Sequence, residues 1–388
     1  AQMFSVNSCA GCHDAPSHHD QVELWDVRRV TTNWPNGQGH SNLDLAMQEG
    51  PSAGCAKCHT SQGFIFWSSS NFATVSCSTT VTTNCYDAAH APAPGANAEP
   101  QTCQACHDPH STTLRLDTTQ PIALEAGYTI SGEGLGQLCQ VCHQSRRGLV
   151  DDQHPMTTVR ASHEPSQADI LNGRNVFLWG NGTVGTPGRH AIAVQDSCVG
   201  CHMKYEAAFV TKQLGHSFSK TNHSFHVDGN VCTNCHGTSV TIESLQGQVE
   251  TLMTNIQTLV NGKYAGAGSV LPATYKVKEV NSGAIWTFTQ KPDSVVVVES
   301  HGSPAFQFNF TTAATVTYPD ATTGTVNQVT FTAGSLTDGS GVALIAPASN
   351  MAMGLWNYFQ VEHDRSFGAH NPSFVLTFLN ATVANIAK

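Results

Sequence analysis

Six copies of the pattern Cys-x-x-Cys-His account for 12 of the 14 cysteines in this chain of 388 residues. Each copy places two thiols three residues apart and an imidazole directly after the second thiol. In chain order, as motifs I to VI, they are Cys9/Cys12/His13, Cys55/Cys58/His59, Cys103/Cys106/His107, Cys139/Cys142/His143, Cys198/Cys201/His202 and Cys232/Cys235/His236. The pattern is typical of covalent c-type haem attachment, in which the thiols bond to the porphyrin and the histidine binds its iron. One copy could be a zinc or redox motif, but six copies with the same histidine predict six haem c groups.

The second axial position of each iron decides what such a site does. A histidine there closes the iron and restricts it to electron transfer, whereas an open position binds substrates such as nitrite or hydroxylamine. The chain has 20 histidines, so subtracting the six motif histidines leaves 14 for six positions. Methionine is the competing ligand, and the chain has seven. These numbers favour two histidines on every iron and predict an electron carrier without catalytic residues.

Several segments resemble, in order along the chain, a family of multihaem c-type cytochromes from respiratory bacteria with relatives in the nitrite-reductase-like group. The similar segments are 39–42 with motif II, motif IV with 162–169, His190 with motif V, 215–218 with motif VI, and 355–372. The resemblance implies that the second ligands are His40, His163, His190, His216 and His370, and the same kind of analogy adds His110. The substitutes that remain open are His18, His19, His223, His226 and His363.

Cys77 and Cys85 are the two cysteines outside the motifs, and they lie in a stretch rich in Ser and Thr. In an oxidising compartment we expect them to form a disulfide, and two unpaired thiols are the alternative. Closing so short a loop constrains the unfolded chain by about 2–3 kcal/mol.

Charge and hydropathy point to a secreted protein. The chain carries 18 basic and 28 acidic residues, a net charge of −10, which argues against nucleic acid or an anionic membrane as a partner. The chain contains no run of 18 apolar residues, so no membrane span is predicted. The sequence opens at Ala1 without a basic or apolar leader, which we interpret as the mature form after removal of a signal peptide. The expected location is extracellular or at the cell surface, with the periplasm as the second choice.

The organisation predicted from the pattern has four parts. Residues 1–240 carry all six motifs and many turn formers, so we expect a mostly irregular and α-helical multihaem domain in which the porphyrins are the core. Residues 241–262 repeat apolar side chains at helical spacing. Residues 266–346 alternate apolar and polar residues and predict a small haem-free β-sandwich, with a hairpin connection at 319–324. Residues 350–388 return to helix.

The predicted function is electron transfer through a series of six haems, with the chain polymerised into a filament. The likeness to filament-forming cytochrome nanowires lies in haem number, size and secretion. A head-to-tail contact that does not close would build such a polymer. The predicted partners are other copies of the chain, other cytochromes or extracellular electron acceptors. The alternatives are a monomeric periplasmic shuttle and a reductase for nitrite, hydroxylamine or tetrathionate.

Overall fold

The computed structural model describes residues 9–10, 13, 25, 40, 43–49, 53–73, 98–111, 113–207, 221–227, 229–237, 242–300 and 302–388. The chain divides into two compact units. Unit 1 comprises 1–124, 129–142 and 191–240, and unit 2 comprises 125–128, 143–190 and 241–388.

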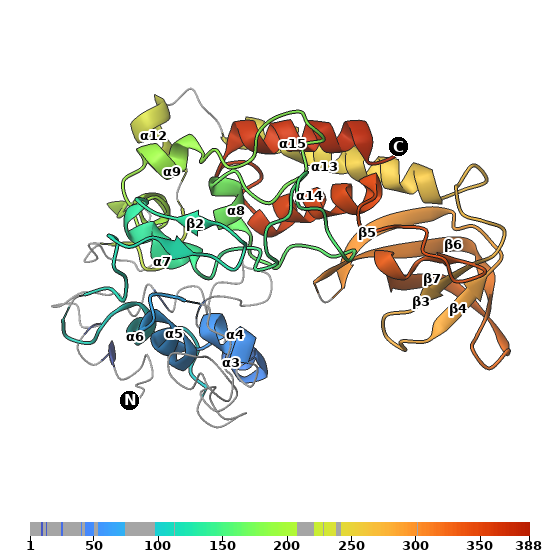
Figure 1. The fold of residues 1–388 in the computed structure, drawn as a ribbon, viewed down its shortest axis with the longest axis horizontal. Coiled ribbons are helices and arrows are strands. Elements are labelled where there is room, and N and C mark those ends of the chain that lie inside the picture. The colour runs from blue at the N-terminus through green and yellow to red at the C-terminus, as the bar shows by residue number, and fades with distance from the viewer. Residues whose placement is uncertain are drawn as a thin grey trace. The chain divides into compact units, whose positions relative to one another are not determined.

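Short helices joined by loops make up the described part of unit 1 (Figure 1). The helices are α3 (Leu43–Glu49), α4 (Ala53–His59), α5 (Ser61–Ser68), α6 (Cys103–Cys106), η1 (Gly134–Gly136), α7 (Gln137–Gln140), α10 (Cys198–His202) and α12 (Asn230–His236). Two short strands, β1 (Ile122–Ala123) and β2 (Thr129–Ile130), pair antiparallel. Motifs II, III, V and VI have both of their cysteines on one helix, and α7 carries the first cysteine of motif IV. Because residues three apart share a helix face, each short helix can present both thiols to one group.

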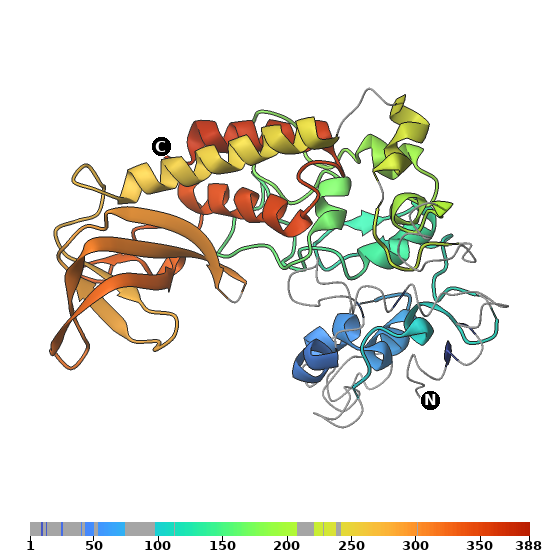
Figure 2. The same ribbon diagram turned by 180° about the vertical axis from the view of Figure 1, so that it is seen from behind.

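Three long helices pack together in unit 2, as the two views in Figures 1 and 2 show. They are α13 (Ile242–Tyr264), α14 (Asn350–Asp364) and α15 (Pro372–Asn385), and two shorter ones, α8 (Gln167–Leu171) and α9 (Arg189–Ala193), precede them in the chain. The amphipathic helix predicted from the pattern is α13, which buries Val249, Ile256 and Val260. Within the described ranges, no helix combines the length and the apolar character needed to cross a bilayer.

The strands of unit 2 form one antiparallel sheet. They are β3 (Tyr275–Lys278), β4 (Ile285–Phe288), β5 (Ser294–Ser300), β6 (Ser303–Thr317), β7 (Thr323–Thr332) and β8 (Thr337–Asp338), with a short helix η3 (Ala333–Ser335) before β8. The order is β5-β6-β4-β3-β8, and β7 also pairs with β6. The predicted hairpin connection at 319–324 joins β6 to β7, where Thr317 lies opposite Thr323.

The length of β6 makes this sheet curl. Its first residues pair with β5, from Ser303 to Asn309, and its last two pair with β4. The register against β7 shifts between Asn309 and Ala314. An irregularity of this kind bends a strand and increases its local twist. Strand β6 therefore pairs with β5 along its first part and with β4 at its last residues, and the sheet curls over its own apolar face.

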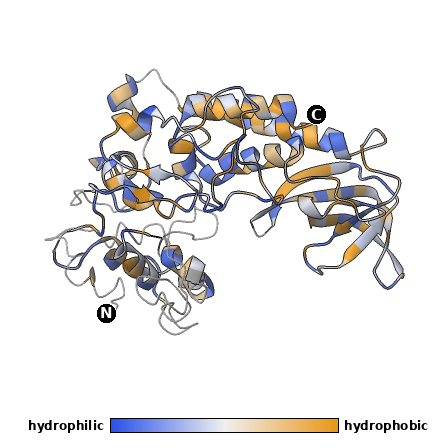
Figure 3. Ribbon diagram, in the orientation of Figure 1, coloured by the Kyte–Doolittle hydropathy of each residue, from blue (hydrophilic) through white to orange (hydrophobic). Residues whose placement is uncertain are grey.

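The predicted fold class is wrong. The structure is 37% helix and 17% strand, and its curled antiparallel sheet is a half-barrel, so the fold is a mixed α and β one. The described strands between 275 and 338 form one sheet, whereas a β-sandwich requires two that face each other. Unit 2 also has a core of apolar side chains. The hydrophobic residues along its helices and strands are coloured orange in Figure 3. The core joins segments far apart in sequence, such as Phe177, Phe306 and Trp356, and short local patterns do not reveal such a combination.

Candidate cofactor site

Thiols from five of the six motifs are neighbours in unit 1. Hydrogen bonds or longer-range electrostatic interactions between thiols link motif I to III, III to IV, IV to V and V to VI, through the pairs Cys9–Cys103, Cys106–Cys139, Cys139–Cys198 and Cys201–Cys232. Cys103 with Cys9 and Cys139 with Cys198 are in hydrogen-bond contact. Groups attached to these thiols would therefore follow one another in an unbroken series.

The predicted attachment residues of motifs II and IV lie on or directly beside short helices. Cys55 and Cys58 are partly buried on α4, and the carbonyl oxygen of Cys58 accepts from Nε2 of Gln101 at 2.6 Å. Cys142 lies two residues beyond the end of α7. It is partly buried, and its N–H donates to the carbonyl oxygen of Cys139 at 3.2 Å. Cys142 thus continues the helical turn that begins with its partner thiol.

Motif VI lies on an exposed helix, and motif I is described only in part. Cys235 is exposed, and so is His236 beside it, because none of the seven residues of α12 is buried. In motif I, His13 is helical and partly buried, but Cys12 lies outside the described residues. The structure therefore does not describe motif I completely, and haem attachment there stays a prediction.

Burial makes the thiols of motif III poor nucleophiles. It raises the pKa of Cys106 to about 11, although the nearby Arg115 lowers it. Burial also raises the pKa of Cys103 to about 12, with a further contribution from Cys9. Redox-active Cys-x-x-Cys pairs depend on a lowered thiol pKa. The shift therefore has the wrong direction for a dithiol redox centre, which was the competing interpretation of a single motif.

Four of the histidines predicted to bind iron are anchored through the ring nitrogen Nδ1. In unit 1, Nδ1 of His202 lies 2.9 Å from the carbonyl oxygen of Phe225. In unit 2, Nδ1 of His143 lies 3.1 Å from Oε1 of Gln167, and Nδ1 of His190 lies 2.8 Å from the carbonyl oxygen of Ala369. The fourth, His370, has its Nδ1 2.5 Å from Oδ1 of Asp364. Histidines that bind metals usually donate their other N–H in this way, and an anchor at Nδ1 directs Nε2 to the opposite side of the ring.

The end of α14 fixes two of these anchors. Arg365, in the left-handed conformation, ends the helix, and the chain then turns through 366–371. Asp364, which is buried, holds His370, and Ala369 holds His190. The side chain of Gln167 donates to the carbonyl oxygen of Asp364 at 3.0 Å. Two predicted ligands and the anchor of a third therefore depend on one helix terminus.

Polar side chains of α14 hold the loop that follows α8. Oδ1 of Asn357 accepts from the backbone N–H of Phe177 at 2.9 Å, and Nδ2 of Asn357 donates to the carbonyl oxygen of Phe177 at 2.7 Å. Nε1 of Trp356 and Nε2 of Gln360 both donate to the carbonyl oxygen of Asn175. These residues are completely buried, so they fix the loop against the helix.

The remaining site residues lie in varied surroundings. His59 and His236 are the last residues of α4 and α12. The ring of His40 stacks on Trp25, with 5.5 Å between centroids, and Nε2 of His163 contacts the guanidinium of Arg146. His110 and His226 are exposed. The predicted site residues outside the described ranges are Cys12, His18, His19, His216 and the proposed disulfide partners Cys77 and Cys85.

His363 has both ring nitrogens engaged by the protein. It is 1% exposed, with Nδ1 3.0 Å from Oγ of Ser162 and Nε2 3.2 Å from Oε2 of Glu299. This hydrogen bond is the main cause of the lowered pKa of Glu299. Glu164 completes a group whose ligand atoms lie within 4.8 Å of one another, but Arg365 pairs with Glu164. The group therefore contains its own positive charge, and His363 serves the packing of unit 2.

Phe225 is a residue that the sequence reasoning missed. Its backbone is left-handed, with φ of 56°. Its carbonyl oxygen anchors His202, and its ring lies 5.2 Å from that of His40 and 6.1 Å from that of His223. It thus links three histidines from distant parts of the chain. The segment Asn222–His226 contains two histidines beside an aromatic residue, which was the available signal.

Two arginines of unit 2 test whether haem fits this donor set. The Nε atoms of Arg147 and Arg160 are buried and have no hydrogen-bond acceptor among the described residues. Burial, and then the neighbouring Arg147, lower the pKa of Arg160. A buried donor left without an acceptor costs about 1–3 kcal/mol. Carboxylates of a bound group would satisfy both donors, and haem carries two propionates. Together with the paired thiols and anchored imidazoles, these residues fit haem c.

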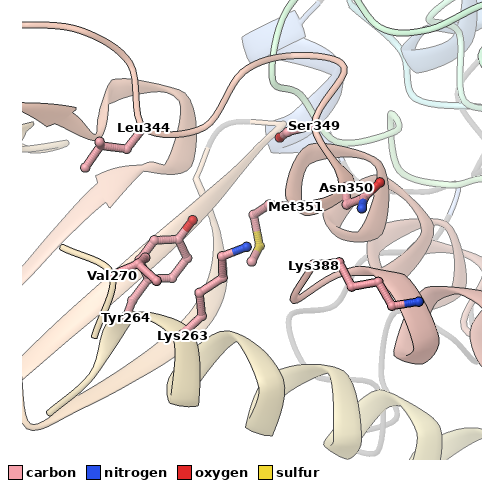
Figure 4. A pocket seen from close by; sticks show the side chains of 8 residues that line it. All are labelled: Lys263, Tyr264, Val270, Leu344, Ser349, Asn350, Met351 and Lys388. Atoms are coloured by element: carbon pink, nitrogen blue, oxygen red, sulfur yellow. The ribbon is translucent and has the colours of Figure 1, made fainter. Parts of the chain in front are cut away.

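A cavity of about 300 Å³ in unit 2 is unrelated to the motifs (Figure 4). Its lining residues come from the ends of α13 and α14 and from the C-terminus, and they are Lys263, Tyr264, Val270, Leu344, Ser349, Asn350, Met351 and Lys388. Lys263 donates to the carbonyl oxygen of Ala387 at 3.2 Å, and burial lowers its pKa. None of the predicted cofactor residues lines this cavity.

Comparison with family models, with curated proteins and with solved structures found no match for this chain.

Proposed function

We propose that this chain is an electron-transfer protein that carries six haem c groups, each held between two histidines. The observation that carries the proposal is the unbroken series of neighbouring motif thiols in unit 1. A structural zinc site brings together the thiols of two such motifs, whereas here five motifs follow one another. When bound, haem c supplies a one-electron iron couple whose potential depends on its axial ligands.

The chain's own part is to attach, orient and enclose these groups. The cysteine pairs on short helices form the covalent bonds, and the motif histidines bind from one face. The anchors on His143, His190, His202 and His370 fix the ring orientations. Second-shell partners of this kind typically change metal affinity 10- to 100-fold. Arg147 and Arg160 would hold propionate carboxylates, which restricts how the porphyrin can rotate.

The number and ligation of haems in the native protein test this proposal. We expect six haems per chain by pyridine haemochrome assay, and only low-spin ferric haem by electron paramagnetic resonance. We also expect the ferrous protein to bind no carbon monoxide. A protein without covalent haem would refute the proposal. Carbon monoxide binding by the wild-type protein would show an open iron and favour the reductase instead.

We also propose that copies of this chain polymerise outside the cell. Charged residues are only 12% of the chain, so few charged side chains would lose their water where copies pack together. Large apolar side chains are exposed on the sheet and its connections in unit 2, including Ile285, Val296 and Val342. Negative-stain microscopy of the purified protein tests this, and fibres are expected. A monodisperse protein at high concentration, found in the periplasmic fraction, would identify a monomeric shuttle.

A further inference from the structure

We infer that His223 is the second axial ligand of the iron attached through motif III, opposite His107. This assignment rests on the proposed function. It takes His223 from the substitutes that remained open and gives it one of the six second-ligand positions. It also pairs a particular histidine with a particular motif, which the sequence did not do.

The distance between the two rings carries the inference. The ring centroids of His107 and His223 lie 6.3 Å apart, with 32° between the ring planes. Imidazole nitrogens bind first-row metals at about 2 Å, and a ring centre lies roughly 1 Å behind its nitrogen, so two rings across one metal are about 6 Å apart. The separation therefore has the length that one metal ion requires.

The local structure holds His223 in this place. Its Nδ1 lies 3.0 Å from Oγ1 of Thr221, which directs Nε2 to the other side of the ring. On both sides of His223 the chain is buried and tied down. The side-chain amide of Asn222 donates to the carbonyl oxygen of His226 at 2.8 Å. The backbone N–H of Asn222 donates to the carbonyl oxygen of Met203 at 3.0 Å. Oγ of Ser224 donates to Oδ1 of Asn222 at 2.5 Å.

His110 does not have these properties. It is exposed, and its backbone is left-handed, with φ of 62°, in the turn that follows motif III. It also lies only three residues beyond His107. Three extended residues span about 10 Å, which is too short a path around the edge of a porphyrin to its opposite face. His110 therefore cannot share an iron with His107.

Carbon monoxide titration of the ferrous holoprotein tests the assignment. We expect His223→Ala to bind one carbon monoxide per chain and to gain one high-spin ferric haem, which added imidazole converts back to low spin. His154→Ala is the control, because His154 is exposed, pairs with Asp151 and is not among the candidate ligands, and we expect this variant to bind none. A His223→Ala protein that keeps six low-spin haems and binds no carbon monoxide overturns the assignment.

A second pair of variants identifies the iron. Replacing Cys103 and Cys106 by serine removes the haem of motif III. If His223 serves that haem, adding His223→Ala to this variant creates no carbon monoxide site, whereas a new site overturns the assignment. Should His223→Ala fail to fold, His223→Met keeps a ligand, and one of the six haems should then have a raised potential, as methionine ligation produces. An unchanged set of potentials would overturn it. A wild-type protein without haem would instead refute the proposed function.

Discussion

Side chains of α13 cover the open edge of the sheet in unit 2, and this gives a sharp test of the structure. Strand β5 pairs with β6 on one side, and its other side meets Gln257 and Asn261. Oε1 of Gln257 accepts from the N–H of Val297 at 3.0 Å, and its Nε2 donates to the carbonyl oxygen of Val297 at 3.2 Å. Oδ1 of Asn261 accepts from the N–H of Val295 at 2.7 Å. An uncovered edge strand would offer these groups to another chain.

Replacing Gln257 by alanine removes both hydrogen bonds to Val297 and a third, to the hydroxyl of Tyr358 at 2.8 Å. Each bond contributes about 1 kcal/mol net, so the free energy of unfolding should fall by about 2–3 kcal/mol. The two bonds to Val297 alone are worth about 2 kcal/mol. A loss of about 2 kcal/mol corresponds to roughly thirtyfold faster exchange of the Val297 amide hydrogen.

Hydrogen exchange, read by mass spectrometry on the β5 peptide, measures this effect directly. Gln248→Ala is the matched control, because Gln248 is exposed on the same helix and bonds only within it, to Ser244. We expect the control to leave β5 protection unchanged. If Val297 exchanges at the wild-type rate in Gln257→Ala, the helix does not hold this edge. If both variants lose the same protection, the loss reflects the stability of α13 and not the edge contact.

Two further predictions concern unit 2. A Cβ at Gly354 would lie 2.5 Å from Cδ1 of the buried Ile386, so Gly354→Ala should destabilise the protein by about 1–3 kcal/mol. Gly247→Ala is the control, because a Cβ at this position of α13 would meet open space, and it should stabilise the protein by about 0.5–1 kcal/mol. Urea unfolding measures both variants, and equal effects would contradict the packing of α14 on α15. Burial raises the pKa of Asp169 to about 6, against hydrogen bonds from Asn175 and Ser145 that lower it. The folded state thus holds this proton more tightly than the unfolded state, and stability should fall as pH rises from about 4 through 6, by at most about 3 kcal/mol. Asp169→Asn should remove that slope, and parallel pH profiles of the urea midpoint for variant and wild type would refute it.

Local pattern predicted the secondary structure of the C-terminal half because each element there has a regular apolar period. The repeat from Leu245 to Val260 became α13, and the alternation of Phe306, Phe308 and Phe310 became the buried face of β6. The helix ends at Tyr264, two residues beyond the predicted boundary at 262. Tyr264 is buried, with its ring 5.4 Å from that of Phe306, and Asn261 bonds to β5, so tertiary contacts hold this end of the helix.

The β-sandwich was wrong for a related reason. Strand patterns show which face of a strand is buried, but they do not show which strands it pairs with. Here β6 pairs with β5, β7 and β4, and this sharing closes the strands into one curled sheet. The expected haem-filled core was also wrong for residues 143–190, because their apolar side chains, such as Ile170 and Phe177, pack with the C-terminal helices.

The sequence by itself determined the chemistry that this chain offers. Cysteines at fixed spacing with a histidine directly behind them lie within one turn of helix, so the attachment sites are local and can be read from the pattern. Second ligands are different, because an imidazole opposite a given motif can come from anywhere in the chain. Composition showed that enough histidines were present, but only the fold brought His223 opposite His107, engaged both nitrogens of His363 and left His110 exposed.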